Sequence, residues 1–177
     1  MDKVFITLMK ESDLVDVLSI ECEAYGEHHW SIDGFRNEIK NDVARYICAK
    51  IQNEDGSFEL IGYMGIWTVF EEAHITTLAV REKYRNSQIA QTLLISQIEY
   101  LYKNMVKYLT LEVRESNQKA INLYEKYGFK SLGKRKNYYQ NNNEDALIMW
   151  TNNIFSTEYK KMFEENKSKI SKEIIYE

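Results

Sequence analysis

The chain has 177 residues, of which 44% are hydrophobic and 28% charged, a composition typical of one globular domain and not of a disordered protein. Its 23 Lys and Arg against 27 Asp and Glu give a net charge of −4, which argues against a general nucleic-acid-binding protein. No apolar run is long enough to span a membrane, and two cysteines without metal-like spacing indicate a reducing compartment. We therefore expect a cytoplasmic protein without metal, nucleic-acid or membrane partners, and the sequence indicates nothing about its oligomeric state.

The first half of the chain predicts strands and two short helices. Ser12 and Asp13 mark a helix start before a series of apolar residues, and Ser31 is placed to cap a second helix. The turn Asn53–Gly56 separates two β-prone runs, as in a hairpin. The predicted strands of this half are Val4–Leu8, Ala44–Ile51, Phe58–Val69 and Ala73–Val80.

In the second half the apolar spacing changes to that of a helix, and strands then follow again. Ser116 or Asn117 can cap a helix that runs through Tyr127, and Gly128 supplies its left-handed end. Residues 151–177 are interpreted as a solvated helical tail. The apolar face of the first helix holds Ala90, Leu94, Ile98, Leu101 and Met105, and the predicted strands are Tyr108–Val113, Phe129–Gly133 and Ala146–Trp150. This order predicts an α/β fold, a mixed sheet with helices on its faces.

A basic turn at a strand–helix junction is the first candidate for chemistry. The strand ending at Val80 is followed by Arg81, Lys83 and Arg85, and a helix begins near Ser87. The first N–H groups of a helix are unpaired and carry partial positive charge, so phosphates bind there. The alternative is a turn that only keeps the junction solvated. Neither a P-loop lysine motif nor G-x-G-x-x-G is present, which argues against those two kinds of nucleotide site.

A carboxylate and a phenol form the second candidate. Glu112 lies on the polar face of its predicted strand near the C-terminal end, where open α/β sheets place ligands. Tyr124 lies on the helix that follows, and the two groups could serve as base and acid. The alternative makes Glu112 a solvated strand residue and Tyr124 a core aromatic. His74, inside a strand, is interpreted as a packed or edge residue and not as a catalytic one.

Two stretches of the chain, taken together, resemble the GCN5-related N-acetyltransferases (GNAT family). They are Leu78–Ala90 and Leu111-Glu-Val-Arg-x-Ser-Asn-x-x-Ala-Ile-x-Leu-Tyr-x-x-x-Gly-Phe129, followed by Arg135-x-Asn-Tyr-Tyr139 and Glu144-Asp-Ala146. The pattern is most similar to the RimI-type subgroup, the protein N-terminal acetyltransferases. The resemblance runs from Val4 to about Trp150. It implies the acyl-CoA N-acyltransferase fold, a mostly antiparallel central sheet flanked by helices, in a domain of residues 1–150, with 151–177 as a C-terminal tail.

The resemblance implies that acetyl-CoA is the co-substrate and that no metal takes part. The pantetheine arm would pair with the backbone of one strand and contact one asparagine, and the pyrophosphate would bind the amides of the loop and helix start. The residues concerned are Leu78, Ala79, Val80 and Asn117 for the arm, and Arg85, Asn86, Ser87, Gln88, Ile89, Ala90 and Gln91 for the pyrophosphate.

The resemblance also implies how the reaction proceeds. Glu112 would be the general base, acting through water on an ammonium substrate, and Tyr124 would protonate the departing CoA thiolate. The acceptor would be the α-amine at a protein N-terminus, in this subgroup that of a ribosomal protein beginning with Ala. The peptide groove would be shaped by His28, His29, Trp30, Arg135, Tyr138 and Tyr139.

Two residues depart from the family pattern. The pyrophosphate loop of the family reads Q/R-x-x-G-x-G/A, and Gln88 stands at its first glycine. We expect helical dihedral angles there, which a glutamine tolerates. Its long side chain would then stand where phosphate approaches, so either it turns away and donates a hydrogen bond or cofactor affinity falls. His29 replaces the proline that the subgroup has before Trp30.

Two other functions stay open. A sibling enzyme could acetylate a small amine or a lysine, which would require a closed acidic pocket in place of a peptide groove. A non-catalytic acyl-CoA-binding module is favoured by Gln88 and disfavoured by the presence of both Glu112 and Tyr124.

Overall fold

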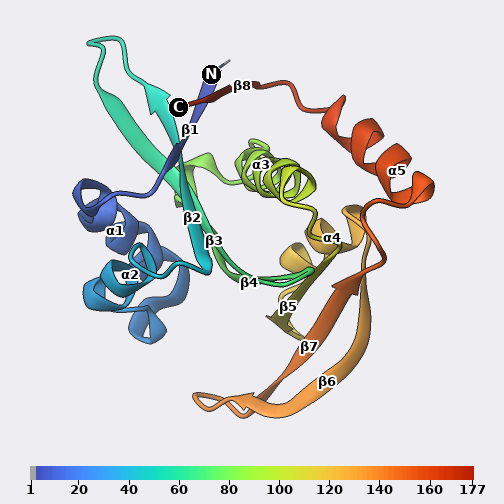
Figure 1. Ribbon diagram of the computed structural model, residues 1–177. Helices are drawn as coiled ribbons and strands as arrows, with labels where there is room; N and C mark the ends of the chain where they lie inside the picture. Colours follow the sequence, from blue (N-terminus) through green and yellow to red (C-terminus); the bar gives the residue numbers. More distant parts are fainter. Residues whose placement is uncertain (1–2) are drawn as a thin grey trace. The chain divides into compact units, whose positions relative to one another are not determined.

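The computed structural model describes residues 3–177 and divides them into two compact units. Unit 1 contains the described residues up to Trp67, together with Thr76–Glu99 and Ile170–Glu177. Unit 2 contains Thr68–Ile75 and Tyr100–Lys169. Strands β3 (Phe58–Val69) and β4 (Glu72–Val80) and helix α3 (Ile89–Lys103) contribute residues to both units (Figure 1). Of the predicted domain 1–150, residues 1 and 2 lie outside the described residues.

The strands of unit 1 follow the order β8-β1-β2-β3-β4. Strand β1 (Lys3–Leu8) pairs antiparallel with β2 (Ala44–Gln52), and β2 pairs antiparallel with β3. On its other side β1 pairs in parallel with β8 (Glu173–Tyr176), the last strand of the chain. The turn between β2 and β3 closes with the Gly56 N–H donating to the Asn53 carbonyl, 3.0 Å, which confirms the predicted hairpin.

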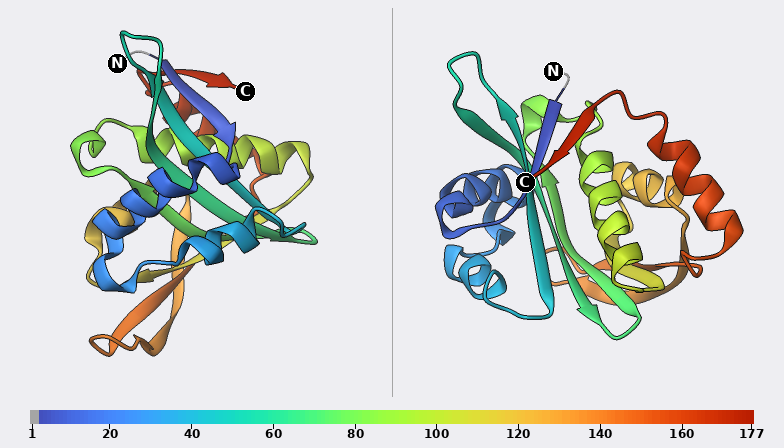
Figure 2. Two further views of the ribbon diagram at one scale, coloured as in Figure 1. Left: turned by 90° about the vertical axis from the view of Figure 1, so that its left-hand side faces the viewer. Right: turned by 45° about the horizontal axis from the view of Figure 1, so that its top comes forward.

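Helices cover both sides of these strands. Helices α1 (Leu14–Tyr25) and α2 (Ile32–Glu38) lie on one side and α3 on the other (Figure 2, right view). The short helices η1 (Glu11–Asp13) and η2 (Gly26–His28) flank α1. The predicted cap of α2 is confirmed, since the Ser31 hydroxyl accepts the Gly34 N–H at 3.1 Å. The core below α1 and α2 is formed by Leu14, Val17, Ile20, Phe35, Tyr46, Cys48, Leu60 and Tyr63, each at most 4% exposed.

Unit 2 has the strand order β6-β7-β5-β4. Strand β5 (Tyr108–Arg114) runs parallel to β4, and β7 (Glu144–Thr151) runs antiparallel to both β5 and β6 (Phe129–Tyr139). The predicted alternation of β5 is confirmed, because its buried residues are Leu109, Leu111 and Val113. The pairings are mostly antiparallel and helices flank the strands, so the α/β fold with a mixed sheet is also confirmed.

Helix α4 (Gln118–Lys126) begins and ends where the sequence predicts. The Asn117 side chain accepts the Ala120 N–H at 3.2 Å and caps the first turn. Gly128 has a φ of 82°, the left-handed conformation that a residue with a Cβ adopts only at a cost. The helix therefore stops there and the chain turns directly into β6.

Two elements differ from the prediction. Helix α3 ends at Lys103, so Met105 does not lie on its buried face but is 64% exposed with a φ of 58°. Strand β6 continues to Tyr139, so Arg135 and Tyr138 lie on a strand and not in a loop. Backbone pairing with β7 overrides the polar composition of this stretch.

The C-terminal stretch is not a solvated tail. It contains helix α5 (Thr157–Lys167), capped by Ser156, and then strand β8. Phe163 is 1% exposed and packs edge-on against the Tyr102 ring at 5.6 Å. The buried side of α5 was not predicted, because Lys and acidic residues are mixed evenly along this stretch. Strand β8 was not predicted, because its partner strand lies at the opposite end of the sequence.

Candidate active site

The loop between β4 and α3 is part of unit 1. After β4 come the short helix η3 (Glu82–Tyr84) and the turn of residues 85–88, and α3 begins at Ile89. Asn86 and Gln88 both have left-handed backbones, with φ of 62° and 66°. The expectation of helical angles at Gln88 is therefore wrong. Gln88 stands where the turn changes direction into the helix, and its carbonyl already accepts the Thr92 N–H at 2.9 Å.

The side chain of Gln88 is held by the C-terminal segment of the same unit. Its Oε1 accepts two hydrogen bonds from Ser171, one from the N–H at 3.0 Å and one from the hydroxyl at 2.9 Å. The side chain thus turns to a protein partner, where its oxygen accepts hydrogen bonds instead of its amide group donating one as expected. The expected effect on cofactor affinity stays a prediction.

The cations of the loop are mostly paired. Arg81 forms an ion pair with Glu23 at 2.7 Å, and Lys83 forms one with Glu59 at 2.8 Å. Within residues 3–177 the Arg85 guanidinium donates only to the Val80 carbonyl, at 3.3 Å, while the Arg85 backbone N–H donates to the Glu82 carbonyl at 3.1 Å. The loop therefore offers an incoming anion its backbone amides and one guanidinium, in place of the three cations that the sequence indicated.

The end of β4 also contacts the end of α1. Leu78 is half-buried, and its carbonyl accepts the Tyr25 hydroxyl at 3.1 Å. Ala79 is 5% exposed and Val80 is half-buried. The predicted cofactor strand thus has one backbone acceptor already engaged by a side chain of α1.

The residues predicted for peptide recognition in unit 1 lie around η2. His28 and His29 are exposed, whereas the Trp30 ring packs on Phe35 at 5.4 Å. The Trp30 N–H donates to Glu21 Oε1 at 3.0 Å. Glu21 is 2% exposed, and this burial raises the pKa of its carboxyl to about 7, against the lowering effect of the Trp30 hydrogen bond. A buried acid that sequence reasoning did not single out thus lies directly beneath this loop.

In unit 2, the two carboxylate oxygens of Glu112 contact two different side chains. His74 Nε2 lies 2.5 Å from Glu112 Oε2, and the Arg135 guanidinium lies 3.2 Å from Oε1. The Glu112 side chain is only 12% exposed, whereas those of His74 and Arg135 are 38% and 55% exposed. A largely buried carboxylate thus has a fixed direction and two polar partners that reach solvent.

The strand register explains this cluster. His74 pairs with Thr110 across the parallel β4–β5 ladder, and Glu112 is two residues further along β5, on the same face. Arg135 comes from β6, which lies beyond β7 in the sheet. His74, interpreted from the sequence as a packed or edge residue and not as a catalytic one, lies within β4 and contacts Glu112. The sequence does place a histidine in the strand before that of Glu112. Whether the two side chains lie on the same face and meet depends on the register of the two strands, which the sequence does not give.

Tyr124 lies on the inner face of α4. It is 7% exposed, and its ring packs against Phe129 at 5.4 Å. Ile121, one turn earlier, is buried on the same face. Tyr124 is therefore packed in the core, as the alternative interpretation of the sequence expected.

The loop after β5 is braced by an acid of β7. Glu144 accepts the Ser116 N–H at 2.8 Å and pairs with Arg114 at 3.3 Å. The Ser116 hydrogen bond, together with Asn142 and Arg114, lowers the pKa of the Glu144 carboxyl to about 2. This bracing fixes the start of α4, where Asn117 caps the helix.

The two tyrosines predicted for peptide recognition lie at the end of β6. The Arg135 guanidinium is 5.8 Å from the centre of the Tyr138 ring, and that of Arg114 is 3.8 Å from the Tyr139 ring. The two rings contact each other edge-on at 5.1 Å. Aromatic and guanidinium groups are therefore interleaved next to Glu112 within unit 2.

The structure brings together only some of the predicted residues. In unit 2 it joins Glu112 to Arg135, and Arg135 to Tyr138. The residues predicted for acetyl-CoA other than Asn117 belong to unit 1, as do His28, His29 and Trp30.

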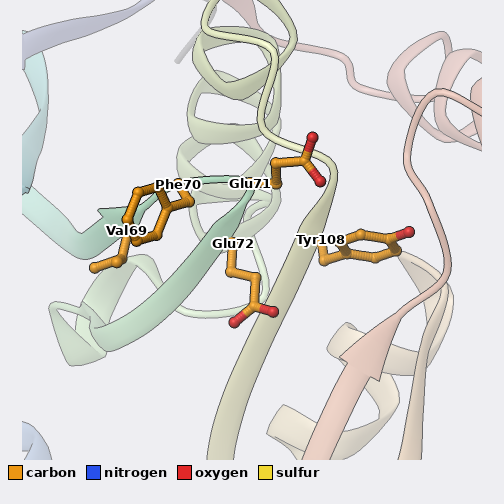
Figure 3. A pocket seen from close by; sticks show the side chains of 5 residues that line it. All are labelled: Val69, Phe70, Glu71, Glu72 and Tyr108. Carbon is orange, nitrogen blue, oxygen red and sulfur yellow. The ribbon is translucent and has the colours of Figure 1, made fainter.

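A surface hollow of unit 2 contains none of the predicted residues. Its lining residues, Val69, Phe70, Glu71, Glu72 and Tyr108, come from the β3–β4 hairpin and the start of β5 (Figure 3). Their side chains point in different directions, and Glu71 is paired with Lys107 at 2.6 Å. We assign it no part in the chemistry.

Neither a metal site nor a membrane-spanning helix is found among the described residues. Among residues 3–177, no three His, Cys, Asp or Glu side chains are grouped so that they could hold a metal ion. Within the same residues, no helix has the length and hydrophobicity needed to cross a membrane.

Comparison with known proteins gives a consistent result. The model of the acetyltransferase (GNAT) family matches residues 13–129. A Bacillus subtilis protein, provisionally named a ribosomal protein bS18-alanine N-acetyltransferase, is 39% identical over 149 residues, which cover 84% of this chain and 95% of that protein.

Solved structures agree on the fold. The crystal structure of the ribosomal-protein-S18-alanine N-acetyltransferase from Escherichia coli has a TM-score of 0.75 and 29% identity, covering 88% of this chain and 97% of that one. The PaiA N-acetyltransferase of Thermoplasma acidophilum in complex with coenzyme A has a TM-score of 0.68 at 19% identity, covering 85% of this chain and 99% of that one. The latter likeness concerns the fold alone.

Proposed function

Since the chain belongs to the acetyltransferase (GNAT) family and is an N-acetyltransferase, we propose that it transfers the acetyl group of acetyl-CoA to the α-amine of a protein N-terminus. The acceptor proposed is a ribosomal protein that begins with Ala. The observation that carries the proposal is the Glu112 carboxylate, largely buried and oriented by His74 and Arg135. The domain proposed for this activity is residues 1–150, with residues 151–177 supporting it.

The proposed chemistry is direct transfer. An α-amine has a pKa of about 8, so removing its proton at neutral pH costs little, and Glu112 takes that proton through a water molecule. The neutral amine nitrogen then attacks the thioester carbonyl, and the C–N bond forms. The nitrogen of this tetrahedral adduct gives up its second proton to water, from which Tyr124 is later reprotonated, and the C–S bond breaks. Tyr124 donates its proton to the departing thiolate. A base and an acid placed in this way each contribute rate factors of about 10² to 10⁴.

The proposed acetyl-CoA contacts are made mainly by backbone groups of β4 and of the loop that follows it. The strand Leu78–Val80 offers backbone groups to the pantetheine arm and an N–H to the developing oxyanion. The amides of Arg85–Gln91, at the start of a long helix, offer partial positive charge to the pyrophosphate. Asn117 is proposed to contact the arm as well, although its Oδ1 is engaged in capping α4.

The choice of acceptor rests on the named relatives. The Bacillus subtilis and Escherichia coli proteins both carry names that specify N-acetylation of an alanine of a ribosomal protein. The exposed imidazoles of His28 and His29 and the cluster of Arg135 with Tyr138 and Tyr139 supply hydrogen-bonding and aromatic groups suited to a peptide.

The test is intact-mass detection of acetyl transfer from acetyl-CoA to a panel of acceptors. The panel contains peptides that differ only in their first residue, Ala, Ser, Met or Gly, the same peptides with blocked N-termini and one internal Lys, and spermidine. Selective modification of free α-amines, with Ala preferred, is the expected result. Transfer only to lysine or spermidine would leave the acetyltransferase assignment intact but overturn the proposed acceptor. Binding of acetyl-CoA without transfer to any member would favour a non-catalytic module.

A further inference from the structure

The C-terminal segment, residues 170–177, reaches the loop that we propose to hold the pyrophosphate of acetyl-CoA. Both belong to unit 1. The matched family model ends at residue 129, so this segment lies beyond it. Ser171 contacts the loop through its N–H and its hydroxyl, which both donate to Gln88 Oε1 at 3.0 and 2.9 Å.

The segment is itself firmly anchored. Its strand β8 forms a parallel ladder with β1, extended by the Glu177 N–H donating to the Ile6 carbonyl at 3.0 Å. The Tyr176 hydroxyl donates to the Glu99 carboxylate, and Ser96 Oγ lies 3.4 Å from the same hydroxyl. Ser96 and Glu99 lie at and beyond the middle of α3, so the segment contacts that helix there and contacts Gln88 immediately before its first residue.

The loop needs such support. Asn86 and Gln88 both have left-handed backbones. Asparagine adopts this conformation readily, whereas for a glutamine it is strained and must be held by the surrounding structure. The Gln88 carbonyl is fixed by Thr92, whose N–H and hydroxyl donate to it at 2.9 and 3.1 Å. Its side chain is fixed by Ser171, which leaves the amide oxygen engaged at the protein and not turned toward an incoming phosphate.

We propose that Ser171 is a positioning residue for acetyl-CoA binding, through which the C-terminal segment holds Gln88 and thereby keeps the loop of residues 85–91 in its binding conformation. This inference rests on the proposed function, because it assumes that the loop holds the pyrophosphate. Ser171 itself need not touch the co-substrate. A glycine at position 88 would adopt the left-handed conformation without support. Gln88 adopts it with the help of the contact that Ser171 makes with its side chain.

The test compares Ser171→Ala with Ser171→Thr, which keeps the hydroxyl. We expect Ser171→Ala to weaken acetyl-CoA binding by about fivefold, the size of one net hydrogen bond, with kcat unchanged and Ser171→Thr close to the original protein. The matched control is Ser168→Ala, because the Ser168 hydroxyl, just after α5, donates to the Glu165 carbonyl of that helix at 2.9 Å, within unit 2.

A double-mutant cycle separates positioning from a general structural effect. In a Gln88→Gly background the Ser171→Ala change should no longer alter the Kd for acetyl-CoA, since its partner is gone. Hydrogen exchange of the amides of residues 85–92, measured without ligand, should be faster in Ser171→Ala than in Ser168→Ala.

The outcomes are distinct. Equal acetyl-CoA affinity in Ser171→Ala and the original protein, unchanged amide exchange, or an undiminished effect in the Gln88→Gly background would each overturn the positioning role while leaving the proposed function in place. Failure of the original protein to bind acetyl-CoA at all would overturn the proposed function itself, and with it the role given to Ser171.

Discussion

At the scale of single residues, the orientation of one carboxylate carries most of the proposed chemistry. Glu112 has an imidazole on one oxygen and a guanidinium on the other, so its oxygens are directed before any substrate arrives. Such preorganisation is what makes a base effective, since the reacting groups need not search for their geometry.

Replacing Glu112 by Gln should therefore lower kcat by about 10²-fold or more, with little change in the Kd for acetyl-CoA, because the amide keeps the shape but cannot take a proton. Steady-state acetyl transfer and calorimetric binding measure the two quantities. The matched control is Glu115→Gln, since Glu115 pairs with Lys134 at the surface, where its side chain is 47% exposed. Unchanged turnover in Glu112→Gln would remove Glu112 from the mechanism.

His74 should matter only through Glu112. Replacing it by Ala is expected to lower kcat by about tenfold, because the carboxylate loses one of its two partners and its fixed direction. His74→Gln, which can still donate a hydrogen bond, should recover part of the loss. In the Glu112→Gln background His74→Ala should have no further effect on kcat, and an additional tenfold loss there would show that the imidazole acts on the substrate independently.

Glu21 gives the stability of unit 1 a pH dependence. The folded state holds its proton up to a pKa of about 7, against 4.5 ordinarily, so the unfolded state releases that proton first. The stabilisation of the folded state by the protonated Glu21 carboxyl is complete below about pH 4.5 and is lost as the pH rises to about 7, a loss of about 3 kcal/mol. Urea unfolding at pH 5 and pH 8 should show a smaller decline for Glu21→Gln than for the original protein. A Glu21→Gln protein with the same decline would assign the pH dependence to other groups.

At the scale of elements, the junction between α4 and β6 depends on one glycine. Gly128 has a φ of 82°, and a Cβ there would lie 3.0 Å from atoms of Met162 and Tyr159. Gly128→Ala should therefore lower the free energy of unfolding by about 2 kcal/mol, from backbone strain and crowding together. Gly133→Ala is the control, because a Cβ at Gly133 meets nothing within 4 Å. Equal denaturant midpoints for the two variants would contradict the proposed role of Gly128.

The elements also show how far the sequence predicts this fold. The Ser31 and Asn117 caps and the Gly128 stop depend on local chemistry, and each was predictable from a few adjacent residues. The length of β6 and the existence of β8 depend on partner strands that are distant in sequence, and local patterns do not contain that information.

The candidate site divides in the same way. Glu112 could be singled out from the alternation of its own strand, whereas its contact with His74 follows from the register of the parallel β4–β5 pair. The Gln88 side chain bonds to Ser171, which is far away in the sequence, and the left-handed backbone of Gln88 is seen only in the folded chain. Neither was visible in any local motif.

At the scale of the whole molecule, three elements link the two units through the chain itself. Strands β3 and β4 and helix α3 each contribute residues to both units, so neither unit can unfold completely without breaking an element of the other. We expect a single thermal transition with equal calorimetric and van't Hoff enthalpies, and coincident loss of far- and near-UV circular dichroism. Two separated transitions would show that the units unfold independently.

The parallel pairing of the first and last strands has a kinetic consequence. Unit 1 is assembled from three separate stretches of chain, and closing the β1–β8 ladder means closing the longest loop that the chain can form. That closure carries the largest entropic cost, so we expect the ladder to form late, after the folding transition state has passed. Interactions absent from the transition state control the unfolding rate and leave the folding rate nearly unchanged. The last residues of the chain therefore set how long the native state lasts, and contribute little to how quickly it forms.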